Sequence, residues 1–144
     1  MKTKQLFYGL LMAGVLLVGG SGCSKEDKED IEPELQNPTI QNLAIGQGNS
    51  KTVQLGEKLL VEADIKAPGK INRVLILLNS LDAPIPVGIS TYLEGDLKDK
   101  TAAHLKWETL IDNVATGRYR LTITVEAKAG VPGQVTSELT VLPK

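Results

Sequence analysis

Hydrophobic and polar residues alternate along most of the chain after residue 38, in short segments that end at glycine, proline or polar turns. A period of two is typical of strands with one buried face. The clearest segment is 118–127, in which Tyr119, Leu121, Ile123 and Val125 share one side. The pattern predicts seven strands, at 39–45, 57–65, 71–78, 87–93, 104–109, 118–127 and 135–141. This many short strands, without a helical pattern, predict one all-β domain over 39–144 built as a two-sheet β-sandwich.

Two proline-glycine pairs mark turns between these strands. Ala67-Pro68-Gly69-Lys70 fits a type II turn, because proline presets φ at the second position and glycine takes the positive φ at the third. Val131-Pro132-Gly133 predicts a second turn, before the last strand.

The third predicted strand is apolar on both sides. Leu75 and Leu77 point away from the side that carries Val74, Ile76 and Leu78. Strands with two apolar faces are usually covered on both. Either a loop of the same domain covers the second face, or this face is a patch for a protein partner, together with the Pro-Ile-Pro loop and the next strand. The candidate contact residues are Leu75, Leu77, Ile85 and Tyr92.

The first 22 residues have the layout of a secretory signal peptide. Lys2 and Lys4 precede an apolar run at 6–18, and small residues follow it up to Gly22. The apolar run is shorter than the roughly 20 residues that a membrane-spanning helix needs. The pattern therefore predicts export, with cleavage before Cys23.

Cys23 is the single cysteine of the chain. Gly20, Ser21 and Gly22 before it resemble a bacterial lipobox, although the common pattern has an apolar residue where Gly20 stands. The resemblance implies that Cys23 is acylated and anchors the protein to a membrane, where each buried CH₂ contributes about 0.8 kcal/mol. A lone cysteine forms no internal disulfide, so the alternative to the lipidation that the resemblance implies is an ordinary unpaired thiol.

Residues 23–38 are charged, contain prolines and have few apolar side chains, so we expect the lipidated cysteine to be followed by a disordered tether. Its acidic residues resemble the surface-export tag of Bacteroidetes-type lipoproteins. This resemblance implies attachment to the outer face of the outer membrane. Retention on the inner leaflet is the alternative.

The segment 116–130 resembles the penultimate strand of bacterial immunoglobulin-like and cadherin-like domains, which often reads G-x-Y-x-L-x-V-x-V. Tyr119 would then occupy the tyrosine-corner position, with its hydroxyl bonded to the preceding loop. The whole layout resembles Bacteroidetes-type surface lipoproteins that carry a single domain of this kind. The resemblance implies an immunoglobulin-like fold and a surface location, and it implies no chemistry.

The candidate chemistry is sparse. From position 35 onward the chain has 12 basic and 11 acidic residues, which excludes the basic footprint typical of nucleic-acid binding. His104 is the single histidine, its predicted strand position faces solvent, and the chain has no Gly-x-Ser-x-Gly elbow. A hydrolase would need His104 to meet a serine and a carboxylate. Zinc and haem sites lack ligands in the mature chain, so we expect a non-catalytic protein without a cofactor.

Contact with a protein partner is therefore the function that the sequence favours. Glycan binding is the first alternative, with Tyr92 as its aromatic platform because Trp107 and Tyr119 are expected in the core. The second alternative is a calcium-binding adhesion module, which would use the carboxylates of one loop but lacks the spacing of an EF-hand. The weak calcium candidates are Glu94, Asp96 and Asp99.

Overall fold

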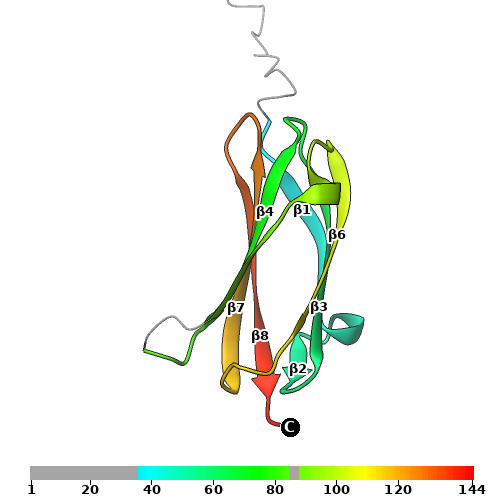
Figure 1. The fold of residues 1–144 in the computed structure, drawn as a ribbon. Coiled ribbons are helices and arrows are strands. Elements are labelled where there is room, and N and C mark those ends of the chain that lie inside the picture. Colours follow the sequence, from blue (N-terminus) through cyan, green and yellow to red (C-terminus); the bar gives the residue numbers. More distant parts are fainter. Residues whose placement is uncertain (1–35, 85–87) are drawn as a thin grey trace, which may run out of the picture. The chain divides into compact units, whose positions relative to one another are not determined.

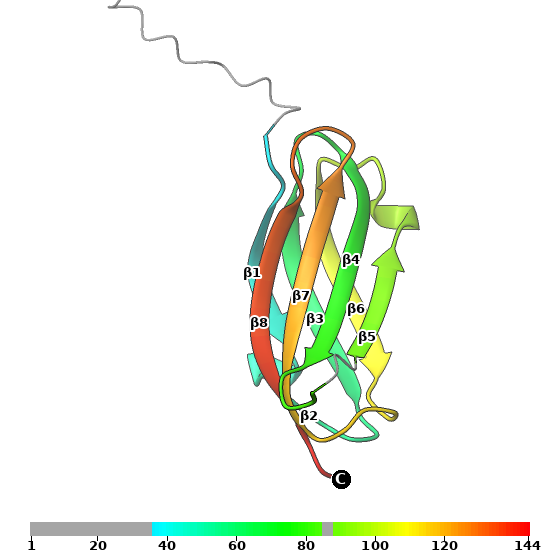
Figure 2. The same cartoon turned by 90° about the vertical axis from the view of Figure 1, so that its left-hand side faces the viewer.

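The computed structural model describes residues 36–84 and 88–144 and shows two sheets packed face to face (Figure 1, Figure 2). The smaller sheet has the strand order β1-β3-β6, and the larger sheet has the order β2-β8-β7-β4-β5. The predicted immunoglobulin-like two-sheet β-sandwich is confirmed, with eight strands in the described residues. The strands are β1 (Thr39–Ile45), β2 (Thr52–Gln54), β3 (Lys58–Lys66), β4 (Ile71–Ser80), β5 (Gly88–Leu93), β6 (Ala102–Leu110), β7 (Gly117–Ala127) and β8 (Gly133–Leu142).

The inward-facing residues of both sheets form the core. In the described residues, 20 hydrophobic side chains are buried there, of which Ile45 is the first and Val141 the last. Trp107 and Tyr119 are 8% and 1% exposed, as predicted for core residues. All of these side chains belong to one compact unit, Ile31–Lys144. A chain that begins at Ile31 therefore contains the whole core of the sandwich, and we expect it to fold on its own.

The short strand β2 is the element that the sequence pattern missed. After β1, the 3₁₀ helix η2 (Gln47–Asn49) carries the chain to the other sheet, where β2 pairs in parallel with β8. The chain turns toward the other sheet at Gly46, whose φ is 74°. Glycine is needed there because other residues rarely adopt this φ and because a Cβ would lie 2.7 Å from Ser50 Oγ. Val53 alone is buried in β2, so alternation gives no signal over three residues.

The turn at 67–70 differs from its predicted form. The Lys70 N–H donates to the Ala67 carbonyl at 2.9 Å, but the positive φ of 62° belongs to Lys70 and not to Gly69. The type II prediction is therefore wrong. Lys70 takes this conformation next to a register shift at the start of β4, and its carbonyl accepts a hydrogen bond from the Lys128 N–H.

The turn predicted at 131–133 lies slightly earlier in the chain. The left-handed residue is Gly130, with a φ of 94°, whereas Gly133 begins β8. A Cβ on Gly133 would lie 2.1 Å from the Pro38 carbonyl oxygen. Glycine is therefore required at this position by the close approach of the chain that leads into β1, and not by a turn.

Tyr119 ties the loop before β7 to the core. Its hydroxyl donates to the carbonyl of Ala115, four residues upstream, at 2.9 Å, while its ring is buried. The tyrosine corner that the resemblance implied is thus present in the structure.

Removing this hydroxyl tests the corner. Tyr119→Phe keeps the ring and loses one hydrogen bond, so we expect the free energy of unfolding to fall by about 1 kcal/mol and the Tm by about 4 °C. Thermal and urea denaturation of residues 31–144 measure both. Tyr92→Phe is the matched control, because Tyr92 is 56% exposed. Equal Tm changes in the two variants would contradict a stabilising role for the corner.

Candidate functional site

The outer face of the five-stranded sheet carries two adjacent rows of residues without a charge. The ladders align Gln134, Thr124, Leu75 and Tyr92 in one row. They align Thr136, Thr122, Leu77 and Ser90 in the next row. We call these eight residues the uncharged face. Strands β8, β7, β4 and β5 contribute two residues each, and no described segment crosses in front of their middle (Figure 2).

The leucines of β4 remain partly accessible on this face. Leu75 and Leu77 are half-buried and do not belong to the core cluster. Tyr92, which pairs with Leu75, is 56% exposed, and Thr122, which pairs with Leu77, is 8% exposed. Cover by a loop would have buried the leucines fully. The structure therefore leaves an accessible surface of leucine, tyrosine and threonine side chains.

An ion pair closes each end of the uncharged face. Arg73 Nε donates to Glu126 Oε2 at 2.5 Å and Nη2 donates to Oε1 at 3.0 Å, so this pair is bidentate. These hydrogen bonds raise the pKa of Arg73 above its ordinary value. At the other end, Arg120 Nη2 lies 3.9 Å from Glu138 Oε1. The face is thus an uncharged centre with an arginine–glutamate ion pair at each end.

The Arg73 guanidinium also covers the ring of Tyr92. Its Cζ atom lies 5.1 Å from the ring centroid, within the range of a cation–π contact. Together with the bidentate pair, this contact holds the Tyr92 ring in place. It also occupies one side of the ring.

The outer face of the three-stranded sheet differs, because charged side chains occur along the whole β3–β6 pairing. Glu62 lies opposite Lys106, and Leu60 lies opposite Glu108. Lys58 and Lys106 both approach Glu108 within 3.9 Å. Exposed pairs of this kind contribute little stability but keep a surface solvated. The two outer faces of the sandwich therefore differ in their affinity for water.

His104 lies on this charged face, as predicted. Its Nδ1 is 2.9 Å from Asp64 Oδ1, and its Nε2 is 4.0 Å from Glu62 Oε1. Asn42, which has a φ of 52° at the bulge in β1, donates from Nδ2 to Asp64 Oδ2 at 2.7 Å. The surrounding depression, of about 510 Å³, has no serine among its lining residues. The serine, histidine and carboxylate that a hydrolase needs do not meet here.

The calcium candidates form no ligand cage. Asp96 lies in the 3₁₀ helix η3 (Gly95–Leu97) and Glu94 directly before it. Asp99 pairs with Lys128, and its N–H donates to the Ile71 carbonyl at 2.8 Å. In residues 36–84 and 88–144, no three His, Cys, Asp or Glu side chains are arranged to hold a metal ion. The carboxylate of Asp99 instead fastens this loop to the loop after β7.

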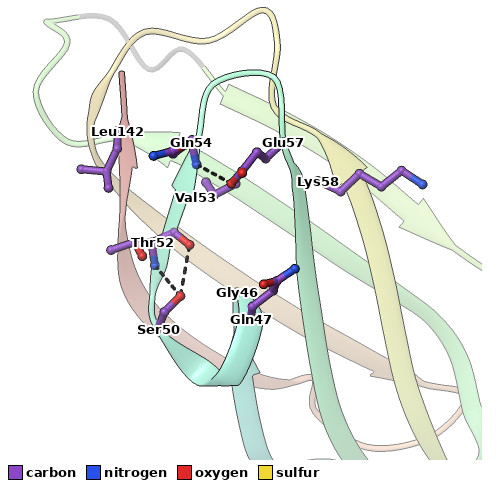
Figure 3. Close-up of a pocket in the computed structure, with 9 residues that line it drawn as sticks. All are labelled: Gly46, Gln47, Ser50, Thr52, Val53, Gln54, Glu57, Lys58 and Leu142. Atoms are coloured by element: carbon purple, nitrogen blue, oxygen red, sulfur yellow. Dashed lines mark hydrogen bonds between the residues drawn. The ribbon is translucent and has the colours of Figure 1, made fainter. Parts of the chain in front are cut away.

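A polar pocket of about 610 Å³ lies beside β2 (Figure 3). Its lining residues come from η2 and the residues on either side of it, from β2, from the start of β3 with Glu57 before it, and from the end of β8. Ser50 Oγ is 3.2 Å from the Thr52 carbonyl, and Glu57 Oε2 accepts the Gln54 N–H at 3.4 Å. These polar groups thus bond within the pocket wall, and no aromatic ring lines the pocket. The sequence carries one sign of it, the glycines at 46 and 48 that follow β1.

The loop after β4 holds one end of the uncharged face in place. Asp82 Oδ2 accepts the backbone N–H of Arg118 at 2.7 Å, and Asp82 Oδ1 lies 2.9 Å from Arg118 Nη2. The backbone hydrogen bond, followed by the side-chain one, lowers the pKa of Asp82. The ends of β4 and β7 are joined in this way.

Of the predicted contacts, the structure brings Leu75, Leu77 and Tyr92 together through the β4–β5 pairing. Ile85 and Cys23 lie outside the described residues. Alternation within 118–127 puts Thr122 and Thr124 on the side opposite the core residues, but it does not align them with the leucines of β4. Alternation shows which side of a strand a residue takes and leaves the register between strands open.

Comparisons with known proteins inform the fold only. No protein-family model matches the chain, and no curated protein matches it in sequence. Wild-type OgpA from Akkermansia muciniphila is similar over 74% of this chain and 29% of OgpA, with a TM-score of 0.52 and 12% identity. Catalytically inactive OgpA with an O-glycopeptide substrate is similar over 73% of this chain and 29% of that chain, with a TM-score of 0.49 and 14% identity. The chain thus spans less than a third of OgpA, and the likeness shows a shared β-sandwich.

Among the residues that the structure describes, no helix is long and apolar enough to span a membrane.

The hydrogen bonds of Asp64 make a pH-dependent prediction. The bond from Asn42 and then the contact with His104 lower its pKa below the ordinary 3.8. A carboxyl group whose pKa is lower in the folded state adds stability above the unfolded value, and this stability is lost as the pH falls through the folded value. We expect Asn42→Ala to raise the Asp64 pKa, as measured by ¹³C NMR of its carboxyl carbon. Asn72→Ala is the control, and an unchanged midpoint in Asn42→Ala would refute the assignment.

Proposed function

We propose that this protein is a non-catalytic, lipid-anchored module of the bacterial cell surface that acts through protein–protein contacts at the uncharged face. The observation that carries the proposal is the pair of charge-free rows, centred on Leu75, Leu77 and Tyr92, between two rows of ion pairs. Protein interfaces commonly have a centre depleted of charge and enriched in aromatic residues, with a polar rim. Exposed apolar patches with polar borders tend to mark contact sites.

Glycan binding is the weaker candidate on two grounds. The Arg73 guanidinium covers one side of the Tyr92 ring, which restricts the ring as a platform for a sugar. The polar pocket beside β2 has no aromatic residue of its own. The exposed aromatic ring and the polar pocket, which a sugar site would combine, therefore occur at separate places on the domain.

The proposed anchor is Cys23. The apolar run, the small residues before the cysteine and the acidic residues after it support cleavage, acylation and display on the outer face of the outer membrane. No calcium or other cofactor is part of the proposal.

Replacing the cysteine tests the anchor. In cells that express the full chain, we expect Cys23→Ser to abolish incorporation of a labelled fatty acid and to move the protein out of the detergent phase on phase separation. Ser24→Ala is the control and should behave as the wild type. If Cys23→Ser remains labelled, the anchor is assigned to the wrong residue.

A crosslinking experiment tests the contact surface. A photoreactive amino acid at Ser90, in the uncharged face, should give crosslinked protein on illuminated intact cells. The same amino acid at Lys106, an exposed strand position on the opposite sheet, should give none. Both positions project from strands, so the comparison isolates the face. Equal yields at the two positions, or no product at Ser90, would argue against the proposal.

A further inference from the structure

We propose that the uncharged face binds the same face of a second copy of the chain. The five-stranded sheets of the two copies pack against each other about a two-fold axis. This axis runs parallel to the strands and passes between β4 and β7. The inference rests on the proposed function and names its partner. The ion pairs at the two ends of the face and the side-chain sizes at its centre favour this partner.

The ion pair at one end of the face is complementary to itself. Arg73 on β4 and Glu126 on β7 lie opposite each other in the ladder. A two-fold axis between these strands places β4 of each copy over β7 of the other. Arg73 then faces Glu126 of the partner copy, and the same contact occurs a second time by symmetry. Opposite charges meet at this end of the interface.

The centre of the face is complementary in size. The same axis places Leu75 over Thr124 of the partner copy and Leu77 over Thr122 of the partner copy. Larger side chains thus meet smaller ones, as in two sheets packed about 10 Å apart with interdigitating side chains. On the outer strands, Tyr92 comes to lie over Gln134 of the partner copy. None of these contacts buries a charge.

The other end of the face accommodates its ion pair. Under the same symmetry Arg120 meets Asn79 of the partner copy, and Glu138 meets Gly88 of the partner copy. Neither charge meets a like charge, and the glycine leaves space for the Glu138 side chain. Each charged group also keeps its partner within its own chain.

The outer face of the smaller sheet does not support the same packing. A two-fold axis between β3 and β6 would place Leu60 over Glu108 of the partner copy and Glu62 over Lys106 of the partner copy. Each row of this face contains a charged side chain, which would lose its water in the interface. The cost of this desolvation offsets the attraction between opposite charges of the two copies. The uncharged face is therefore the favoured surface for self-association.

The size of the face predicts a weak dimer. Four strands spaced about 4.8 Å apart, with about seven residues at 3.3 Å each, give roughly 440 Å² of flat surface per copy. Stable interfaces use about 800 Å² per partner. We therefore expect a dissociation constant in the micromolar range or weaker in solution. Anchoring of both copies to one membrane would raise their effective concentration and favour the dimer.

Two charge variants test the inference, in residues 31–144. Arg73→Glu leaves acidic side chains at both positions of the 73–126 pair, and Glu126→Arg leaves basic side chains at both. Each variant alone should associate more weakly than the wild type, because like charges meet across the axis. An equimolar mixture should form a heterodimer at least about tenfold tighter than either homodimer. Each chain in the mixture still lacks its internal ion pair, so repair within one chain does not explain this result.

The amide signals in NMR spectra show which residues take part in the heterodimer. Addition of unlabelled Glu126→Arg chain to ¹⁵N-labelled Arg73→Glu chain should shift the amide signals of Leu75, Leu77 and Thr122. Addition of unlabelled Arg73→Glu chain should not. The signals of Glu62 and Lys106 on the other sheet should stay in place. Absence of shifts in the mixture, or shifts confined to the smaller sheet, would overturn the proposed dimer.

A second pair of variants tests the apolar centre. Leu77→Lys should abolish the concentration dependence of the wild-type spectrum up to about 1 mM, where even a Kd of 1 mM populates a dimer. Leu60→Lys, on the other sheet opposite Glu108, is the matched control. Its spectrum should keep the concentration dependence of the wild type. A wild-type chain whose spectrum does not change over this range, and whose rotational correlation time is that of a monomer, refutes the second copy.

The two proposals fail in different ways. If the wild-type chain is a monomer but Ser90 crosslinks to a different protein on cells, the contact surface stands and the second copy is wrong. If Ser90 crosslinks to the same chain and the charge variants form a heterodimer, both proposals are supported. If Ser90 gives no product and the chain is a monomer, both are wrong.

Discussion

Strand β4 is hydrogen-bonded along both edges, to β7 on one side and to β5 on the other, and this double pairing determines what the larger sheet presents to solvent. Its alternate residues Val74, Ile76 and Leu78 are completely buried in the core. Because side chains alternate along a strand, Leu75 and Leu77 must then face outward. A slip of one residue would exchange the two sets and expose the core side chains. The outward leucines are thus a consequence of how the core is filled.

Electrostatics distinguish the two outer faces of the sandwich. On the smaller sheet, charged groups occur along the whole β3–β6 pairing, and a histidine, three carboxylates and three lysines are solvated together. On the larger sheet, the two uncharged rows lie between rows in which arginine meets glutamate, and Arg118, beyond them on β7, pairs with Asp82. Arg73 also rests on Tyr92, so one side chain neutralises a carboxylate and orders the exposed ring. This distribution favours the larger sheet as the contact surface.

Alternation in the sequence predicted the fold class, seven of the strands and the core positions of Trp107 and Tyr119, because burial on one side of a strand leaves a period of two. It missed β2, whose single buried residue, Val53, is too little to show a period. It placed the left-handed residue of a turn at Gly69, whereas the structure has it at Lys70, next to the bulge at the start of β4. Proline-glycine pairs indicate turns well, but neighbouring strands decide which residue takes the positive φ.

The sequence by itself determined the β-sandwich and the two-faced apolar strand, because alternation marks each strand and the side that each residue takes. The tyrosine corner followed from the resemblance of segment 116–130 to known domains. The lipid anchor and the export of the chain remain predictions from its first residues. The tertiary structure alone decided that Leu75 and Leu77 lie in rows with Thr122, Thr124 and Tyr92. It also decided that Arg73 meets Glu126, 53 residues away along the chain. Spacing within a segment sets which way each side chain points, but the register of hydrogen-bonded strands sets what it meets.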